Sequence, residues 1–90
     1  MKKYEVRSAK WVDGSGWSYS TTIDWLETPC TAEEYILNNL DSVLDYPRDG
    51  TDYYYSITEY NYDPDTEWYG EGAEISGAWA SETFDAAAEG

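Results

Sequence analysis

The feature that most constrains the fold is a strict alternation of large and polar side chains between Trp17 and Trp25. Successive side chains of a strand point to opposite faces of its sheet, so the alternation predicts a strand with one face against a core. Residues 4–12 are predicted to pair with it, because residues 13–16 supply two glycines for a tight hairpin turn. One face of the later strand would then carry Trp17, Tyr19, Thr21, Ile23 and Trp25.

A helix is predicted to follow. Thr31 and Glu34 have the spacing of a capping box, and apolar residues then recur at helical intervals up to Leu44. We expect the helix to end near Leu44 or Asp45, because the residue before Pro47 disfavours helical dihedral angles. The expected apolar stripe consists of Ile36, Leu37, Leu40, Val43 and Leu44.

Two further strands complete the expected fold. Residues 53–62 alternate in the manner of a strand, and residues 67–80 are predicted to return beside them, with a bulge or bend at 70–72. The order ββαββ predicts an α+β fold, a four-stranded antiparallel sheet with one helix packed on a face. Ninety residues correspond to a single domain, 1–90, whose small and acidic end, 81–90, is expected to be a frayed tail.

The charge of the chain is large and unevenly placed. Nineteen acidic residues oppose five basic ones, for a net charge of −14. From residue 11 onward the sequence holds one cation, Arg48, against eighteen acids. Such a composition is typical of disordered chains, but the same stretch carries five Trp and nine of the ten Tyr, which indicates a folded domain. Because self-repulsion destabilises a compact state, we expect the acids to meet a basic protein surface.

The composition argues against several other functions. The acids would repel nucleic acid and anionic membranes, so direct binding to either is not expected. The first residues lack the apolar core of a signal peptide, and no apolar run approaches the roughly 20 residues of a membrane helix, so a cytoplasmic location is expected. The chain has no histidine, and Cys30 has no activating neighbour, so neither an enzyme nor a cofactor is expected. The sequence leaves the oligomeric state open, monomer or dimer.

In size, acidity and interleaved aromatic residues, the chain resembles the small acidic proteins of phages and mobile elements that imitate DNA. The resemblance implies a non-catalytic inhibitor of the anti-CRISPR or anti-restriction type, which occupies a basic DNA-binding groove of a bacterial defence complex inside the host cell. Outward side chains of a strand lie roughly 6–7 Å apart, close to the spacing of phosphates along DNA. The predicted partner-binding residues are Asp24, Glu27, Glu34, Asp41, Asp45, Asp49, Asp52, Glu59, Asp63, Asp65, Glu67, Glu71 and Glu74.

A small calcium-binding module is one alternative. Asp63, Asp65, Glu67 and Glu74 occupy ligand positions of a 12-residue calcium loop within residues 63–74. Trp68 stands where such a loop requires glycine, and the flanking segments are predicted to be strands. A hairpin loop with solvated acids is therefore the favoured interpretation, and these four residues are weak metal candidates.

A carbohydrate-binding face is another alternative. Aromatic rings on a strand can stack on sugars or on a proline-rich peptide, although a small domain with few aliphatic residues also needs aromatic rings for its core. The candidate face consists of Tyr53, Tyr54, Tyr55, Tyr60, Tyr62, Trp68 and Tyr69.

Overall fold

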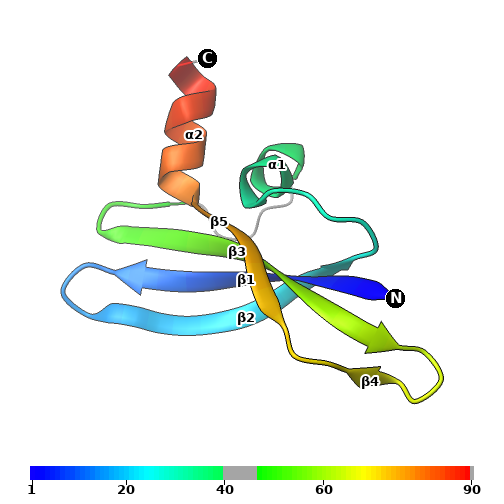
Figure 1. Ribbon diagram of the computed structural model, residues 1–90. Coiled ribbons are helices and arrows are strands. Elements are labelled where there is room, and N and C mark those ends of the chain that lie inside the picture. Colours follow the sequence, from blue (N-terminus) through cyan, green and yellow to red (C-terminus); the bar gives the residue numbers. More distant parts are fainter. Residues whose placement is uncertain (40–46, 90) are drawn as a thin grey trace.

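The structure, a computed structural model, describes residues 1–39 and 47–89; the predictions for Leu40, Asp41, Val43, Leu44 and Asp45 lie outside them. It shows a mixed α and β fold, in which a curled antiparallel sheet carries two short helices (Figure 1). In chain order the elements are β1 (Lys2–Val12), β2 (Gly16–Leu26), α1 (Ala32–Asn38), β3 (Thr51–Asp63), β4 (Trp68–Tyr69), β5 (Ala73–Trp79) and α2 (Ala80–Glu89).

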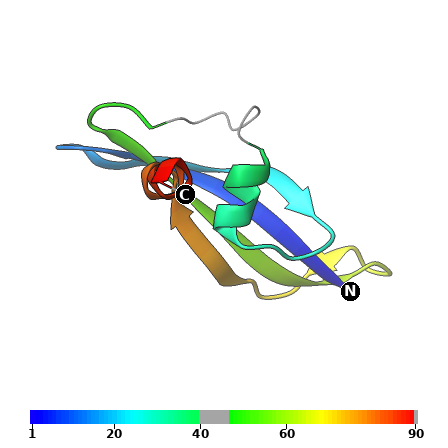
Figure 2. The same cartoon turned by 90° about the horizontal axis from the view of Figure 1, so that it is seen from above.

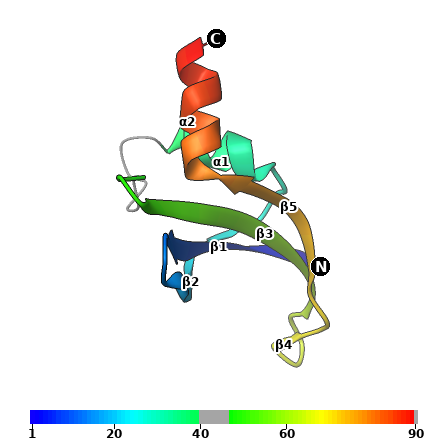
Figure 3. The same cartoon turned by 90° about the vertical axis from the view of Figure 1, so that its left-hand side faces the viewer.

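The sheet is built around β1 and β3. β1 pairs with β2 on one side and with β3 on the other, and both β4 and β5 pair with the remaining edge of β3. Figure 3 shows β2, β1, β3 and β5 following one another, with the two helices above β5. The expected fourth strand is divided into β4 and β5, so residues 1–39 and 47–89 contain five strands and not the four predicted.

The division falls at residues 70–72, where an interruption is predicted. The Gly70 amide donates to the carbonyl of Asn61 at 2.7 Å, and the chain then leaves β3 before pairing again at Ala73. A Cβ atom on Gly72 would overlap the ring of Tyr60, so a larger residue at this crossing would have to displace that ring. The twist of the sheet between its two ends is plain from above (Figure 2).

One face of the sheet forms the core. Val6 and Ile57 are fully buried and lie opposite each other in the β1–β3 register, as are Ser8 and Tyr55. α1 adds Ile36, which is also fully buried, to a cluster that includes Tyr55. Val6 and Ser8 therefore share one face of β1, and Tyr55 and Ile57 share one face of β3, because the two strands pair without a register shift.

The predicted face of β2 is correct for Ile23, which packs against the core, but wrong for Trp17 and Trp25. Val6 pairs with Asp24 but Arg7 pairs with Thr22, and a second register shift lies between Ala9 and Trp11. Each bulge inserts one residue into β2 and moves the following side chains to the other face. Trp17 and Trp25 consequently lie on the face away from the helices, opposite Trp11 and Glu5, and are 55% and 45% exposed.

Helix α1 begins as predicted. Thr31 accepts a hydrogen bond from the Glu34 amide at 3.1 Å, and its hydroxyl donates to the Glu34 carboxylate at 3.2 Å. In the described residues α1 ends at Asn38, because Asn39 leaves helical geometry with φ −125°; the predicted end near Leu44 or Asp45 lies outside them. The side chain of Asn39 donates instead to the carbonyl of Tyr35 at 2.8 Å.

A second helix, α2, forms where residues 81–90 are predicted to be a frayed tail, so the described residues contain two helices and not one. Ala80 is fully buried, Thr83 is 6% exposed, and Phe84 packs against the core cluster of β3 and α1. Asp52 holds the start of α2 by accepting hydrogen bonds from the Ser81 amide, at 3.1 Å, and from the Ser81 hydroxyl. Tertiary packing thus stabilises a helix that the short sequence of residues 80–89 does not predict on its own.

Candidate interaction surface

The face of the sheet away from the helices is rich in aromatic rings, and we call it the open face. Its rings gather in two groups, one toward each end of the sheet, because β3 places Tyr54 and Tyr60 six residues apart on the same face. The first aromatic cluster comprises Trp11, Trp17, Tyr54 and Trp79, and the second comprises Trp25, Tyr60, Tyr62 and Tyr69.

The first aromatic cluster is assembled from four strands. Trp17 of β2 stacks on Trp79 of β5, with ring centroids 5.4 Å apart and planes inclined by 19°. Trp11 meets Trp17 edge-on at 5.2 Å, and Tyr54 meets Trp79 at 5.3 Å. Because Trp17 nevertheless remains 55% exposed, this cluster offers a rigid aromatic surface to a partner.

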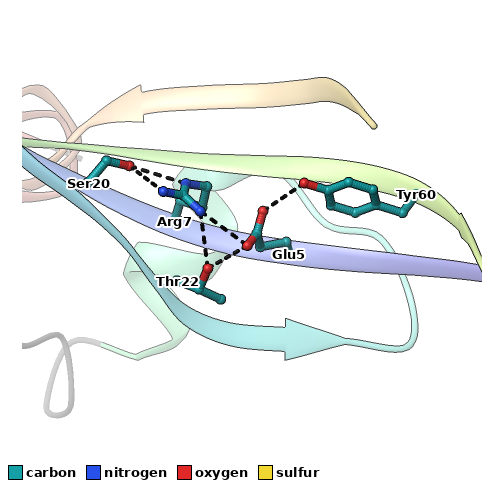
Figure 4. Close-up of polar contacts among 5 residues, drawn as sticks. All are labelled: Glu5, Arg7, Ser20, Thr22 and Tyr60. Carbon is teal, nitrogen blue, oxygen red and sulfur yellow. Dashed lines mark hydrogen bonds and ion pairs between the residues drawn. The ribbon is translucent and has the colours of Figure 1, made fainter. Parts of the chain in front are cut away.

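A polar network on the same face joins β1, β2 and β3, and Figure 4 shows its hydrogen bonds. Glu5 is 6% exposed and accepts hydrogen bonds from Thr22, from the Tyr60 hydroxyl at 3.0 Å and from Arg7 at 3.2 Å. Arg7 also donates to Ser20 at 3.0 and 3.1 Å. Burial raises the pKa of Glu5, but these hydrogen bonds and the Arg7 charge outweigh it and leave the pKa below its ordinary value. The network is fully paired, so we assign it to stability.

Tyr54 extends the first aromatic cluster toward the carboxylates at the edge of the sheet. Its ring lies across Gly77, where a Cβ atom would come within 1.8 Å of the tyrosine hydroxyl. The hydroxyl donates to Glu74 at 3.3 Å. Burial raises the pKa of Tyr54, and the charges of Glu74 and then Glu33 raise it further.

Two grooves adjoin each other beside the first aromatic cluster. The larger, of about 430 Å³, lies between the β1–β2 hairpin and the start of α2 and includes Trp11, Asp13, Arg48 and Glu82 in its lining. The smaller, of about 270 Å³, lies between the two helices and β5 and includes Glu33, Tyr54 and Glu82. Trp79 and Glu82 line both grooves, so they form the partition between them.

We call four carboxylates beside these grooves the acidic band: Asp13, Glu33 and Glu82 line the grooves, and Glu74 accepts the hydrogen bond from Tyr54. Asp52 also lines the larger groove but is bound to Ser81. In the part of the chain that the structure describes, ion pairs join Lys2 to Glu59 at 3.0 Å, Lys3 to Glu27 at 3.7 Å and Arg7 to Glu5 at 3.2 Å. No member of the acidic band takes part in an ion pair among these residues. The band therefore carries negative charge that no ion pair in these residues neutralises, although Arg48 lines the larger groove together with Asp13 and Glu82.

Several predicted partner-binding residues already have partners within the chain. Glu27 and Glu59 pair with lysines, Glu34 caps α1, and Asp52 holds α2. Asp24 accepts hydrogen bonds from the Tyr35 hydroxyl at 3.1 Å and from the Trp25 amide at 2.8 Å. Asp49 is exposed in the loop before β3, and Asp41 and Asp45 lie outside the described residues.

The remaining predicted acids, apart from Glu74, are exposed around the β3–β4 hairpin at the other end of the sheet, namely Asp63, Asp65, Glu67 and Glu71. Asp63 accepts a hydrogen bond from the Asp65 amide at 3.0 Å, and Glu67 has a φ of 54° in the turn. Within residues 1–39 and 47–89, no group of three or more His, Cys, Asp or Glu side chains comes together in a way that could hold a metal ion. The structure thus provides no support for a calcium site in residues 63–74.

Sequence reasoning missed three of the four members of the acidic band, Asp13, Glu33 and Glu82, and its aromatic walls. Asp13 is assigned only to a turn and Glu82 to a tail, while Trp11 and Trp79 are not included in the candidate aromatic face. Alternation along residues 4–12 does place Trp11 on the face opposite Val6, so that signal was present. No local pattern places Glu82 beside Asp13, because their approach depends on α2 folding back over β3.

The hydrogen bond from Tyr35 to Asp24 allows a test of how stability changes at alkaline pH. Burial raises the pKa of Tyr35 to about 12, helped by the hydrogen bond to Asp24 and its charge. Because the folded state holds this proton more tightly, the contribution of Tyr35 to stability is complete below pH about 10 and is lost as the pH rises toward 12. We expect the free-energy difference between wild type and Tyr35→Phe to fall across that interval in chemical unfolding. A constant difference would contradict the assignment.

Comparison with protein-family models, curated proteins and solved structures finds no match to this chain. Neither helix of the described segments is long and apolar enough to cross a membrane.

Proposed function

We propose that this protein binds a basic, nucleic-acid-binding surface of another protein and inhibits it by taking the place of DNA, with a bacterial defence complex as the expected target. The observation that carries the proposal is the acidic band, whose four carboxylates form no ion pair within the described residues. Charge of this kind is costly to a folded domain unless a partner neutralises it.

The dimensions are compatible with a short stretch of duplex. The longest extent of the molecule is 46 Å, over which B-DNA would carry about 27 phosphate charges. A net charge of −14 is therefore about half the charge of the DNA it would replace. This charge is sufficient for competition over part of a DNA channel. The proposal does not require the protein to match the charge of a full duplex.

The open face provides exposed aromatic residues, which are a second feature of protein interfaces. Interfaces are enriched in Trp and Tyr at their centre and are charged at their rim. Here the first aromatic cluster lies directly beside the acidic band, since Tyr54 and Trp79 belong to the cluster and line the same groove as Glu33. Aromatic area would provide affinity, and the carboxylates would provide fast, salt-sensitive association.

The proposal is tested by capture of partners from a bacterial lysate, followed by a DNA-binding assay on the captured complex. We expect one nucleic-acid-binding complex, released at high salt and displaced by duplex DNA, whose DNA binding this protein inhibits. Changing Glu33 and Glu82 to Lys should weaken that inhibition at least about tenfold. Recovery of basic proteins without preference, or inhibition that is insensitive to salt, would show that the acids do not act by mimicry.

A further inference from the structure

We propose that the two grooves separated by Trp79 and Glu82 each receive an arginine side chain of the partner, held by the Trp and Tyr rings and by the acidic band. This inference rests on the proposed function and names the chemical group that the surface recognises. The grooves adjoin each other, so the recognised element is a pair of neighbouring arginines.

The size of the grooves favours side chains over a larger ligand. Sites for drug-sized molecules enclose about 300–1,000 Å³. The larger groove, of about 430 Å³, lies at the lower end of that range, and the smaller, of about 270 Å³, lies below it.

The walls of the larger groove are suited to a planar cation. Trp11 donates its indole N–H to the Asp13 carboxylate at 3.3 Å, which fixes the orientation of both side chains. Glu82 approaches the same groove from the first turn of α2. A cation placed there is within reach of a tryptophan face and of two carboxylates, which is the combination that cation–π contacts and salt bridges use together.

The smaller groove repeats this chemistry with different residues. Glu33 of α1 and Glu82 of α2 both line it, and Tyr54 and Trp79 provide aromatic walls. Because α1 is anchored by the Ala32 amide donating to the Ser76 hydroxyl at 2.8 Å, the position of Glu33 beside β5 is held by the fold. The negative charge of these walls excludes an anionic ligand.

Arginine fits these grooves better than lysine. A guanidinium is planar, stacks on aromatic rings and binds carboxylates through two parallel hydrogen bonds, whereas an ammonium is compact and strongly hydrated. The chain's own Arg48 lines the larger groove but forms no ion pair in the described part of the molecule. Its charge opposes entry of a partner cation, so its removal should improve binding.

The test is a titration of the folded protein with a short peptide that carries two adjacent arginines. Binding is monitored by tryptophan fluorescence at physiological salt. At that ionic strength the Debye length is about 8 Å, so distant charges contribute little. We expect the double variant Glu33→Gln, Glu82→Gln to bind about tenfold more weakly. A matched variant, Asp65→Asn with Glu67→Gln, removes the same charge from the β3–β4 hairpin and should change affinity less than about twofold.

Two further comparisons sharpen the result. A dilysine peptide should bind several-fold more weakly than the diarginine peptide, and Arg48→Ala should bind the diarginine peptide about twofold more tightly. Equal losses in the groove and hairpin variants, or equal affinity for the two peptides, would overturn the assignment of the grooves. The proposed function is tested separately by capture from a lysate. A partner that is released by salt and displaced by DNA would support that function even if the groove assignment failed, and the absence of such a partner would count against it.

Discussion

Replacing Ile57 by alanine is expected to lower the free energy of unfolding by about 2–5 kcal/mol. Ile57 is fully buried in the centre of β3, where it lies opposite Val6 and in one cluster with Tyr4. Truncation removes buried methyl groups and leaves a cavity that the neighbouring strand cannot fill without losing its register. A domain of this size has a stability of only about 5–13 kcal/mol, so the variant should unfold at a much lower urea concentration.

The control for this prediction is Trp17→Ala, which removes a larger side chain. Trp17 is 55% exposed, so its loss should cost about 0.5–1.5 kcal/mol, chiefly the stacking on Trp79. Urea midpoints followed by circular dichroism measure both variants. If Trp17→Ala were the more damaging change, the location of the core on the α1 side of the sheet would be wrong.

Replacing Glu5 by glutamine is expected to cost about 1.5–3 kcal/mol at neutral pH. Glu5 is buried and accepts hydrogen bonds from Thr22, Tyr60 and Arg7, so its carboxylate oxygens face donors from three strands. An amide would turn one of its own donors toward them and would leave Arg7 without its counter-charge. The matched variant Glu59→Gln, at an ion pair whose side chains are 50% and 32% exposed, should cost less than about 1 kcal/mol.

The effect of Glu5 should also depend on pH in a definite direction. Its pKa lies below the ordinary value, so its contribution to stability is present above the unfolded-state pKa and is lost as the pH falls through the folded-state value. Acidification also relieves the repulsion among the other acids, which acts in the opposite direction. The difference between wild type and Glu5→Gln removes that common effect and should shrink at low pH. A difference that stays constant would contradict the lowered pKa.

The acidic band shows how far a sequence can lead toward a site. Composition indicates a basic partner, and the excess of acids after residue 11 is visible without any structure. The sequence does not show which acids form the site, because each acid taken alone is also compatible with a solvated surface. Contacts in the structure distinguish the acids. Glu27 and Glu59 form ion pairs, whereas Glu33 and Glu82 line the same groove.

The sequence by itself determined the elements whose signals are local. Alternation placed Val6 and Ile57 on the buried face, glycines marked the hairpin turns, and Thr31 marked the start of α1. The tertiary structure alone decided the two bulges of β2, the folding of α2 and the grouping of the acidic band. A periodic pattern depends on neighbouring residues along the chain. A bulge depends on the strand it pairs with, and a short helix such as α2 depends on burial of Ala80 and Phe84 against distant residues.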